Sequence, residues 1–257
     1  MLRFLAIPLC ALVFSGASIQ DGKDWMKQAE DQLYRWPAAP ATVRFEAHTD
    51  VLATMLAAMK RDLEKQPEAE AARLVAALEK LTVSGTLDTA TGKLETEIKV
   101  DFTTSDARTK AALETIKQRV QATFAGCFAS LPLHDPTLLR KGSAVSAAEE
   151  REGERIVTAD GVCPGERTVL HFARDTGLPK AIELPETALA FSYTQATPGH
   201  FVPASLEMHA RGGAPSRAEF QWLQKDEYWF PEHVRLSSRG ANAKIDFDHV
   251  VVERRTR

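Results

Sequence analysis

The stretch Tyr228–Leu236, YWFPEHVRL, places three aromatic residues directly before a proline and then alternates apolar and polar side chains. Val234 and Leu236 fall on one side of an extended chain, and His233 and Arg235 on the other, because successive side chains of a strand point to opposite faces. Proline has no N–H to give to a ladder and is tolerated at the start of a strand. The stretch therefore predicts a strand that begins at Pro231, with one apolar and one wet face.

The same pattern occurs twice more. Leu178-Pro179 leads to two alternating aliphatic residues, and so does Val202-Pro203. Each copy follows a short polar turn-forming stretch. We therefore expect the three prolines to begin three strands of one meandering antiparallel sheet with a half-covered face.

Further candidate strands fill most of the chain from residue 155 to the end, with Gly, Pro or Asp at many of the joins and no helical period between them. An earlier pair, around 81–88 and 94–102, also alternates with period two and encloses the turn residues DTATG. Between this hairpin and the later strands, residues 105–127 carry an apolar stripe at helical spacing. The pattern indicates an antiparallel meander with an inserted helix rather than a series of βαβ units.

Helical patterns precede the hairpin. Residues 24–36, 49–66 and 68–81 place apolar side chains three and four residues apart, and prolines separate the three runs. The expected organisation is a helical segment at 19–80 followed by a β domain at 81–257.

Residues 1–18 have the composition of a secretory signal peptide. One cation, Arg3, precedes the apolar run from Leu5 to Phe14, and small residues follow it. The run is too short for a permanent membrane helix, and no other stretch is long enough. The alternatives are a buried N-terminal helix and lipidation at Cys10, which lacks the small preceding residue that lipidation needs. We expect a protein exported to the periplasm or the exterior and not an integral membrane protein.

Export affects the expected oxidation state of the cysteines. Removal of residues 1–18 leaves Cys127 and Cys163, an even number in an oxidising compartment. Cys163 lies in the turn-rich sequence DGVCPGE, which favours exposure. We therefore predict a disulfide between them; the alternative is two buried thiols.

The composition limits the classes of ligand and partner that the protein could bind. The 257 residues carry a formal net charge of -3 and no polybasic stretch, which excludes an ordinary nucleic-acid-binding surface. The seven histidines form no metal-binding motif, and no nucleophile elbow or phosphate-binding loop is present. We predict no cofactor, no metal and no catalytic residue. An exported hydrolase without a recognisable motif is the enzymatic alternative.

The segments DTGLPKAIEL, GHFVPASLEM, EYWFPEHVRL and AKIDFDHVVV together resemble the LolA-like and LppX-like lipoprotein-carrier superfamily. The resemblance covers roughly residues 81–253 and is strongest after 166. It implies an α+β fold, an open antiparallel half-barrel with helices on its concave side. It also implies an apolar cavity that holds a hydrophobic small molecule or a lipid or lipoprotein acyl chain, and a transient membrane or envelope-protein partner. This chain has about three N-terminal helices where the superfamily typically has one.

Strand parity selects the side chains that would line such a cavity. They should share the concave face and look toward the stripe of the inserted helix, which includes Leu113 and Ile116. The predicted lining residues are Phe191, Tyr193, Leu206, Met208, Phe220, Trp222, Val234, Leu236 and Phe247 from the sheet, and Val120 and Phe124 from the helix. The alternative is a structural or interaction protein whose helices fill this face completely.

Overall fold

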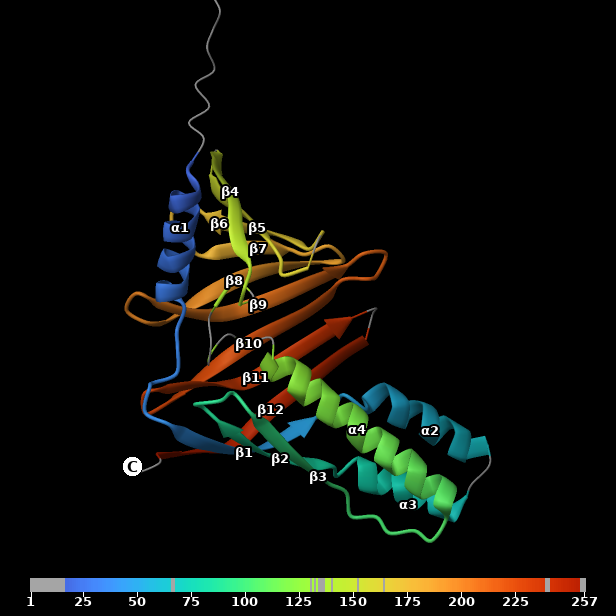
Figure 1. Cartoon of the computed structure of the whole chain (residues 1–257). Helices are drawn as coiled ribbons and strands as arrows, with labels where there is room; N and C mark the ends of the chain where they lie inside the picture. Colours follow the sequence, from blue (N-terminus) through green and yellow to red (C-terminus); the bar gives the residue numbers. More distant parts are fainter. Residues whose placement is uncertain are drawn as a thin grey trace, which may run out of the picture.

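The computed structural model describes residues 17–65, 68–129, 131, 133, 137–139, 141–151, 153–163, 165–238 and 241–254. Most of the predicted signal peptide, residues 1–16, lies outside the described part. Within that part the chain forms one open, antiparallel sheet of twelve strands with four helices (Figure 1). The predicted α+β class is confirmed.

The elements follow one another simply. The first part contains α1 (Ile19–Gln32), β1 (Ala41–Thr49), α2 (Ala53–Lys65), α3 (Ala69–Leu78), β2 (Thr82–Asp88), β3 (Leu94–Lys99) and α4 (Ala107–Ala129). The meander then contains β4 (Ala144–Arg151), β5 (Glu154–Asp160), β6 (Arg167–Ala173), β7 (Pro179–Glu183), β8 (Thr187–Thr197), β9 (His200–Ala210), β10 (Ser216–Lys225), β11 (Tyr228–Ser238) and β12 (Ala241–Arg254).

The sheet order is β3-β2-β1-β12-β11-β10-β9-β8-β7-β6-β5-β4. From β4 to β12 each strand lies beside its predecessor, as a meander requires. Strand β1 then pairs with β12 and carries the first hairpin, β2–β3, outside it. The predicted helical segment 19–80 therefore also contains a strand, β1, and a further strand that was not predicted, β4, precedes β5.

The three prolines lie at register shifts. Phe172 pairs with Pro179, Tyr193 with Pro203 and Trp222 with Pro231. In each case the ladder skips the residue after the proline, which is left as the extra residue of a β-bulge: Lys180, Ala204 and Glu232. Only Pro179 begins its strand, because Pro203 and Pro231 stand inside β9 and β11. A bulge bends its strand and increases the local twist, so the repeated pattern encodes curvature as much as strand beginnings.

Both groups of helices cover the same face of the sheet. Helix α1 packs on Val157, Leu170 and Ile182 through Trp25, Met26 and Ala29. The ladder connects Ile182 to Leu189 and Leu189 to Met208, which shares a face with Leu206. From Leu206 the ladder continues through Ala218 to Leu236, which packs toward the core of α4. Figure 1 shows α1 over one half of the sheet and α2, α3 and α4 beside the other half.

The larger core lies under α4. Asp106 begins this helix, and its carboxylate accepts a hydrogen bond from the backbone N–H of Thr109 at 2.7 Å. The stripe predicted from the sequence is buried here: Leu113, Ile116, Val120 and Phe124. Phe45, Phe128, Phe230 and Phe247 add a cluster of rings whose centroids lie 5.2 to 5.7 Å apart. Side chains of α4 therefore fill the space between this helix and the sheet.

The predicted disulfide is not formed in the structure. Cys127 is buried in the core under α4, whereas Cys163 is exposed in the turn between β5 and β6. That turn belongs to the other half of the sheet, which has a separate core with α1. Burial raises the pKa of the Cys127 thiol to about 12, which keeps it in the unreactive protonated form.

Candidate functional site: an uncovered apolar strip between two cores

The predicted lining residues divide into two groups. Those facing α4 belong to the large core, where Val120, Phe124, Phe220, Val234 and Phe247 are buried. Leu206, Trp222 and Leu236 are half-buried against the same core. Six of these side chains come from the sheet and two from α4 itself, and all eight pack in one core, so the protein already fills this part of the face.

The second group lies between the two cores. It consists of Phe191, Tyr193 and Met208. Together with Leu189, which was not among the predicted residues, we call them the open strip, because none of the four belongs to either hydrophobic cluster. Met208 is 41% exposed, and the other three are half-buried. An apolar strip that the protein's own helices leave uncovered is the feature most typical of a binding surface on this face.

A pocket of about 240 Å³ lies at one end of the strip. Phe191 and Tyr193 line it and stack on each other, with ring centroids 6.2 Å apart and planes 21° from parallel. Phe201 and Leu178 add further apolar wall, and Thr176 and Lys180 lie at the same pocket. Burial raises the pKa of the Tyr193 hydroxyl. The pocket is therefore an aromatic recess with a few polar groups, the usual composition of a small-molecule site.

The bulges contribute to this recess. Tyr193 lies opposite Pro203 at the bulge of β9, and Lys180 is the extra residue of the bulge in β7. Bulges re-aim side chains and are common beside functional sites. The ammonium group of Lys180 donates a hydrogen bond to the carboxylate of Glu154 at 2.7 Å. This hydrogen bond, followed by one from His171, lowers the pKa of Glu154.

A second apolar pocket, of about 380 Å³, lies between α2 and α3. Its aliphatic wall comes from Leu52, Leu56, Leu78 and Leu81, and an ion pair between Lys60 and Glu79 joins the two helices at its rim. Sequence reasoning did not predict this pocket. It depends on how two helices meet, which their separate periodic patterns do not specify.

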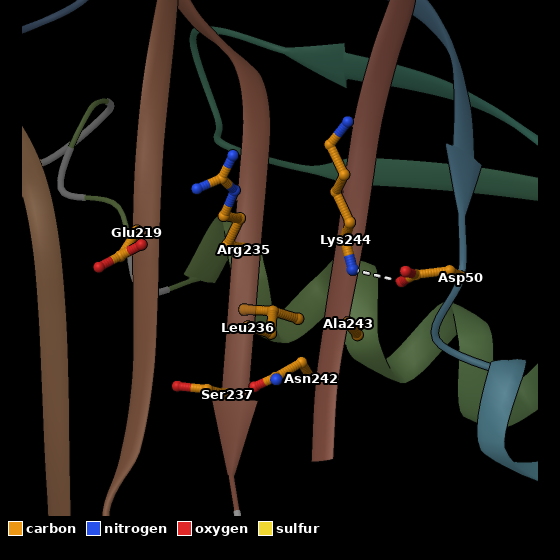
Figure 2. Close-up of a pocket in the computed structure, with 8 residues that line it drawn as sticks. All are labelled: Asp50, Glu219, Arg235, Leu236, Ser237, Asn242, Ala243 and Lys244. Carbon is orange, nitrogen blue, oxygen red and sulfur yellow. Dashed lines mark hydrogen bonds between the residues drawn. The ribbon is translucent and has the colours of Figure 1, made fainter. Parts of the chain in front are cut away.

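The opposite face of the sheet is polar. Figure 2 shows a depression of about 410 Å³ there, with Glu219, Arg235 and Lys244 on three neighbouring strands. Asp50 lies at its edge, and its carboxylate accepts a hydrogen bond from the backbone N–H of Lys244. Two cations and two anions line this depression, which makes it unsuitable for an aliphatic chain.

His233 and Asp246 also lie on this polar side, opposite each other on β11 and β12. Asp246 accepts from the ammonium group of Lys244 at 2.8 Å and lies 2.6 Å from the Nδ1 atom of His233. Burial raises the pKa of Asp246, but these two partners outweigh it, so the pKa falls below its ordinary value. His209 lies 2.8 Å from the carboxylate of Glu207. In the described ranges, no group of three or more metal-binding side chains is arranged to hold an ion.

Comparison with known proteins gives a structural likeness only. No family model matches the sequence, and no curated protein matches it. A LolA superfamily protein from Nitrosomonas europaea matches with a TM-score of 0.28 and 8% identity, over 92% of this chain and 94% of that one. A DUF1329 family protein from Desulfovibrio piger matches with a TM-score of 0.25 and 8% identity, over 90% and 92%. Neither match says what this chain binds.

Across the described residues, no helix is long and apolar enough to cross a membrane.

Proposed function

We propose that this protein is an exported, non-enzymatic carrier that binds an acyl chain, or a ligand of similar apolar shape, along the open strip. The observation that carries the proposal is the gap between the two cores, where Phe191 and Met208 remain accessible on a face that is otherwise covered. Every methylene that leaves water contributes about 0.8 kcal/mol, so one chain gains useful affinity from a strip of this kind.

The size of the recess indicates how much of the ligand it holds. Pockets that enclose a drug-sized molecule measure roughly 300 to 1,000 Å³. The recess at Tyr193 is smaller, about 240 Å³. It therefore holds one end of a chain, and the remainder passes Leu206 and continues across Leu189 and Met208.

The first test replaces an exposed apolar residue by a charge. Met208→Glu places a carboxylate in the strip, and Val251→Glu places one at a similarly exposed position of β12, 49% exposed against 41%. We expect Met208→Glu to weaken the binding of dansyl-labelled undecanoic acid about tenfold or more, because the chain must then desolvate a charge. Val251→Glu should bind as wild type. Equal binding by both variants would show that the acyl chain does not bind along the strip.

The second test narrows the strip without adding charge. Ala218 lies on the helix-covered side, opposite Leu206 and Leu236, whereas Ala190 lies on the other side of β8, opposite Glu207. We expect Ala218→Leu to reduce uptake while Ala190→Leu leaves it unchanged, with melting temperatures measured for both. Wild-type protein that takes up no labelled chain would favour the alternative of a structural protein with a self-filled core.

The position of signal-peptide cleavage, next to Ser18, provides a test of export. The Ser18 hydroxyl accepts from the backbone N–H of Asp21 at 3.1 Å, and Asp21 accepts from the backbone N–H of Ser18, which together form the capping box of α1. Loss of such a cap costs about 1 kcal/mol. We expect signal cleavage after Ala17, one residue before the end of the predicted segment, so that the mature chain keeps the cap. Mass measurement of the secreted protein decides this, and an uncleaved chain would contradict export by this route.

A further inference from the structure

The three tyrosines of the chain differ in how their hydroxyl groups are paired. The Tyr34 hydroxyl donates to the carbonyl of Glu227 at 2.5 Å. The Tyr228 hydroxyl donates to the carbonyl of Ala39 at 2.8 Å. The Tyr193 hydroxyl, in contrast, forms no hydrogen bond with any residue that the structure describes. It therefore remains available to a group from outside the chain.

Tyr193 lines the recess at one end of the open strip, where it is half-buried. Its ring stacks on Phe191, which restrains the side chain. Burial raises the pKa of its hydroxyl, so the hydroxyl stays protonated and can donate a hydrogen bond at neutral pH. A tyrosine hydroxyl that loses water on burial usually has a partner, because an unpaired donor costs free energy. A ligand atom that accepts a hydrogen bond would complete this site.

Lys180 brings a positive charge to the same recess. Of the described residues that line the recess, Lys180 is the only charged one. The printed hydrogen bond of its ammonium group goes to the carboxylate of Glu154 at 2.7 Å. An ammonium group has three N–H donors, so two remain for a ligand. A cation and an unpaired hydroxyl donor in one recess favour an anionic acceptor, because hydrogen bonds to charged groups are the stronger ones.

The recess has a polar side toward solvent and an apolar side toward the protein. Thr176 and Lys180 are exposed, whereas Leu178 and Pro179 between them are buried. The Thr176 hydroxyl oxygen accepts from the backbone N–H of Leu178 at 3.3 Å, and its own proton can still be donated to a ligand. A ligand that fits both sides therefore carries a polar group and an apolar chain.

We propose that the recess binds the carboxylate head group of a free fatty acid, through the Tyr193 hydroxyl and the Lys180 ammonium group. The inference rests on the proposed function, since it names which end of the acyl chain the recess holds. The chain then leaves the recess along the open strip. An esterified chain lacks the charge that Lys180 would pair with, so the site selects the free acid. The reverse orientation, with the methyl end in the recess, would leave both donors without an acceptor.

The first experiment compares two probes that differ only in the head group. Dansyl-labelled undecanoic acid and its methyl ester are titrated into the wild-type protein, and the dissociation constants are taken from the dansyl fluorescence. We expect the acid to bind about tenfold more tightly than the ester. An ester that binds as tightly as the acid, or more tightly, overturns the head-group site and leaves the carrier proposal standing. Absence of binding by both probes overturns the two proposals together.

The second experiment removes the charge and keeps the length of the side chain. Lys180→Met should weaken binding of the acid about tenfold and leave binding of the ester unchanged, so that the preference for the acid disappears. Lys93→Met is the matched control, since the Lys93 ammonium group donates to Glu95 at the same distance of 2.7 Å but lies in the first hairpin. This control should bind both probes as the wild type does. A Lys180→Met variant that keeps the preference overturns the role of Lys180.

The third experiment separates binding from stability at the tyrosines. Tyr193→Phe should weaken binding of the acid about fivefold, while the melting temperature of the ligand-free protein stays as in the wild type, because the hydroxyl has no described partner to lose. Tyr228→Phe should do the reverse, lowering the melting temperature and leaving the binding of the acid unchanged. If Tyr193→Phe binds the acid as the wild type does, or melts as early as Tyr228→Phe, the Tyr193 hydroxyl is not the donor to the head group.

Discussion

At the scale of single residues, two glycines show how position decides the effect of a methyl group. Gly85 in β2 lies under the ring of Phe45, so an added Cβ would overlap that ring. Gly126 lies inside α4 with open space beside it. The same substitution should therefore act in opposite directions at the two positions.

We predict that Gly85→Ala destabilises the fold by about 1 to 3 kcal/mol, the usual cost of overpacking a core. Gly126→Ala should stabilise it by up to about 1 kcal/mol, because alanine is the better helix former. Urea unfolding of the two variants measures both. A stable Gly85→Ala variant would mean that Phe45 can move away without loss.

The two cysteines permit a second prediction at this scale. Cys163 is exposed, and the Cys127 thiol is buried with its pKa raised to about 12. A maleimide at neutral pH should label Cys163 in the folded protein and Cys127 only after denaturation. If neither cysteine is labelled in denatured, unreduced protein, the disulfide expected from the sequence is present after all.

At the scale of elements, period-two alternation predicted the first hairpin, and short apolar runs with Gly, Pro or Asp at many of the joins predicted the eight strands from β5 to β12. Strand β1 alternates at Val43, Phe45 and Ala47 over nine residues, but it was not predicted because it lies between two helical patterns. Strand β4 could not be found this way, since small residues such as Ala148 form its buried side against Gly22 of α1. Parity also predicted the face of the candidate site. Which part of that face the helices leave open depends on where α1 and α4 lie, and no local pattern specifies that.

The bulges could not be predicted from the sequence. Their importance can be tested at Glu232. Glu232 is the extra residue at Pro231, and beyond it Phe230 and Tyr228 are fully buried. Deletion of Glu232 leaves Trp222 opposite Pro231 but removes the bulge and its bend, which we expect to displace Phe230 and Tyr228 from the core and prevent folding. Pro231→Ala should cost less than about 1 kcal/mol, since the bulge keeps the register. Circular dichroism melting distinguishes the two, and a folded deletion variant would show that the bulge is dispensable.

At the scale of the whole molecule, carboxylates that tie the strands together make stability depend on pH. Hydrogen bonds from Lys180 and His171 lower the pKa of Glu154 from its ordinary 4.5, and despite burial Lys244 and His233 lower that of Asp246 from 3.8. Groups whose pKa is lower in the folded state contribute stability that is complete above their ordinary pKa values. That stability is lost as the pH falls through the lowered values.

We therefore predict that the free energy of unfolding is level near neutral pH and declines below about pH 4. Glu154→Gln and Asp246→Asn should each lower stability at neutral pH and flatten this acid decline. Urea unfolding across the pH series measures both effects. If a variant loses as much stability at low pH as the wild type, the carboxylate that it lacks does not cause the acid dependence.

The pairing of β1 with β12 also concerns the order in which the chain is made. Ala41 lies opposite Arg254, so β1 can pair with β2 early but its ladder with β12 waits until residue 254 has been made. The hairpin β2–β3 joins the sheet only through β1, so it waits as well. Pairings between such distant residues form late, because a long loop must close first. While it is being synthesised, the chain therefore lacks the ladder between β1 and β12, and its largest core is completed only after the last strand has been made.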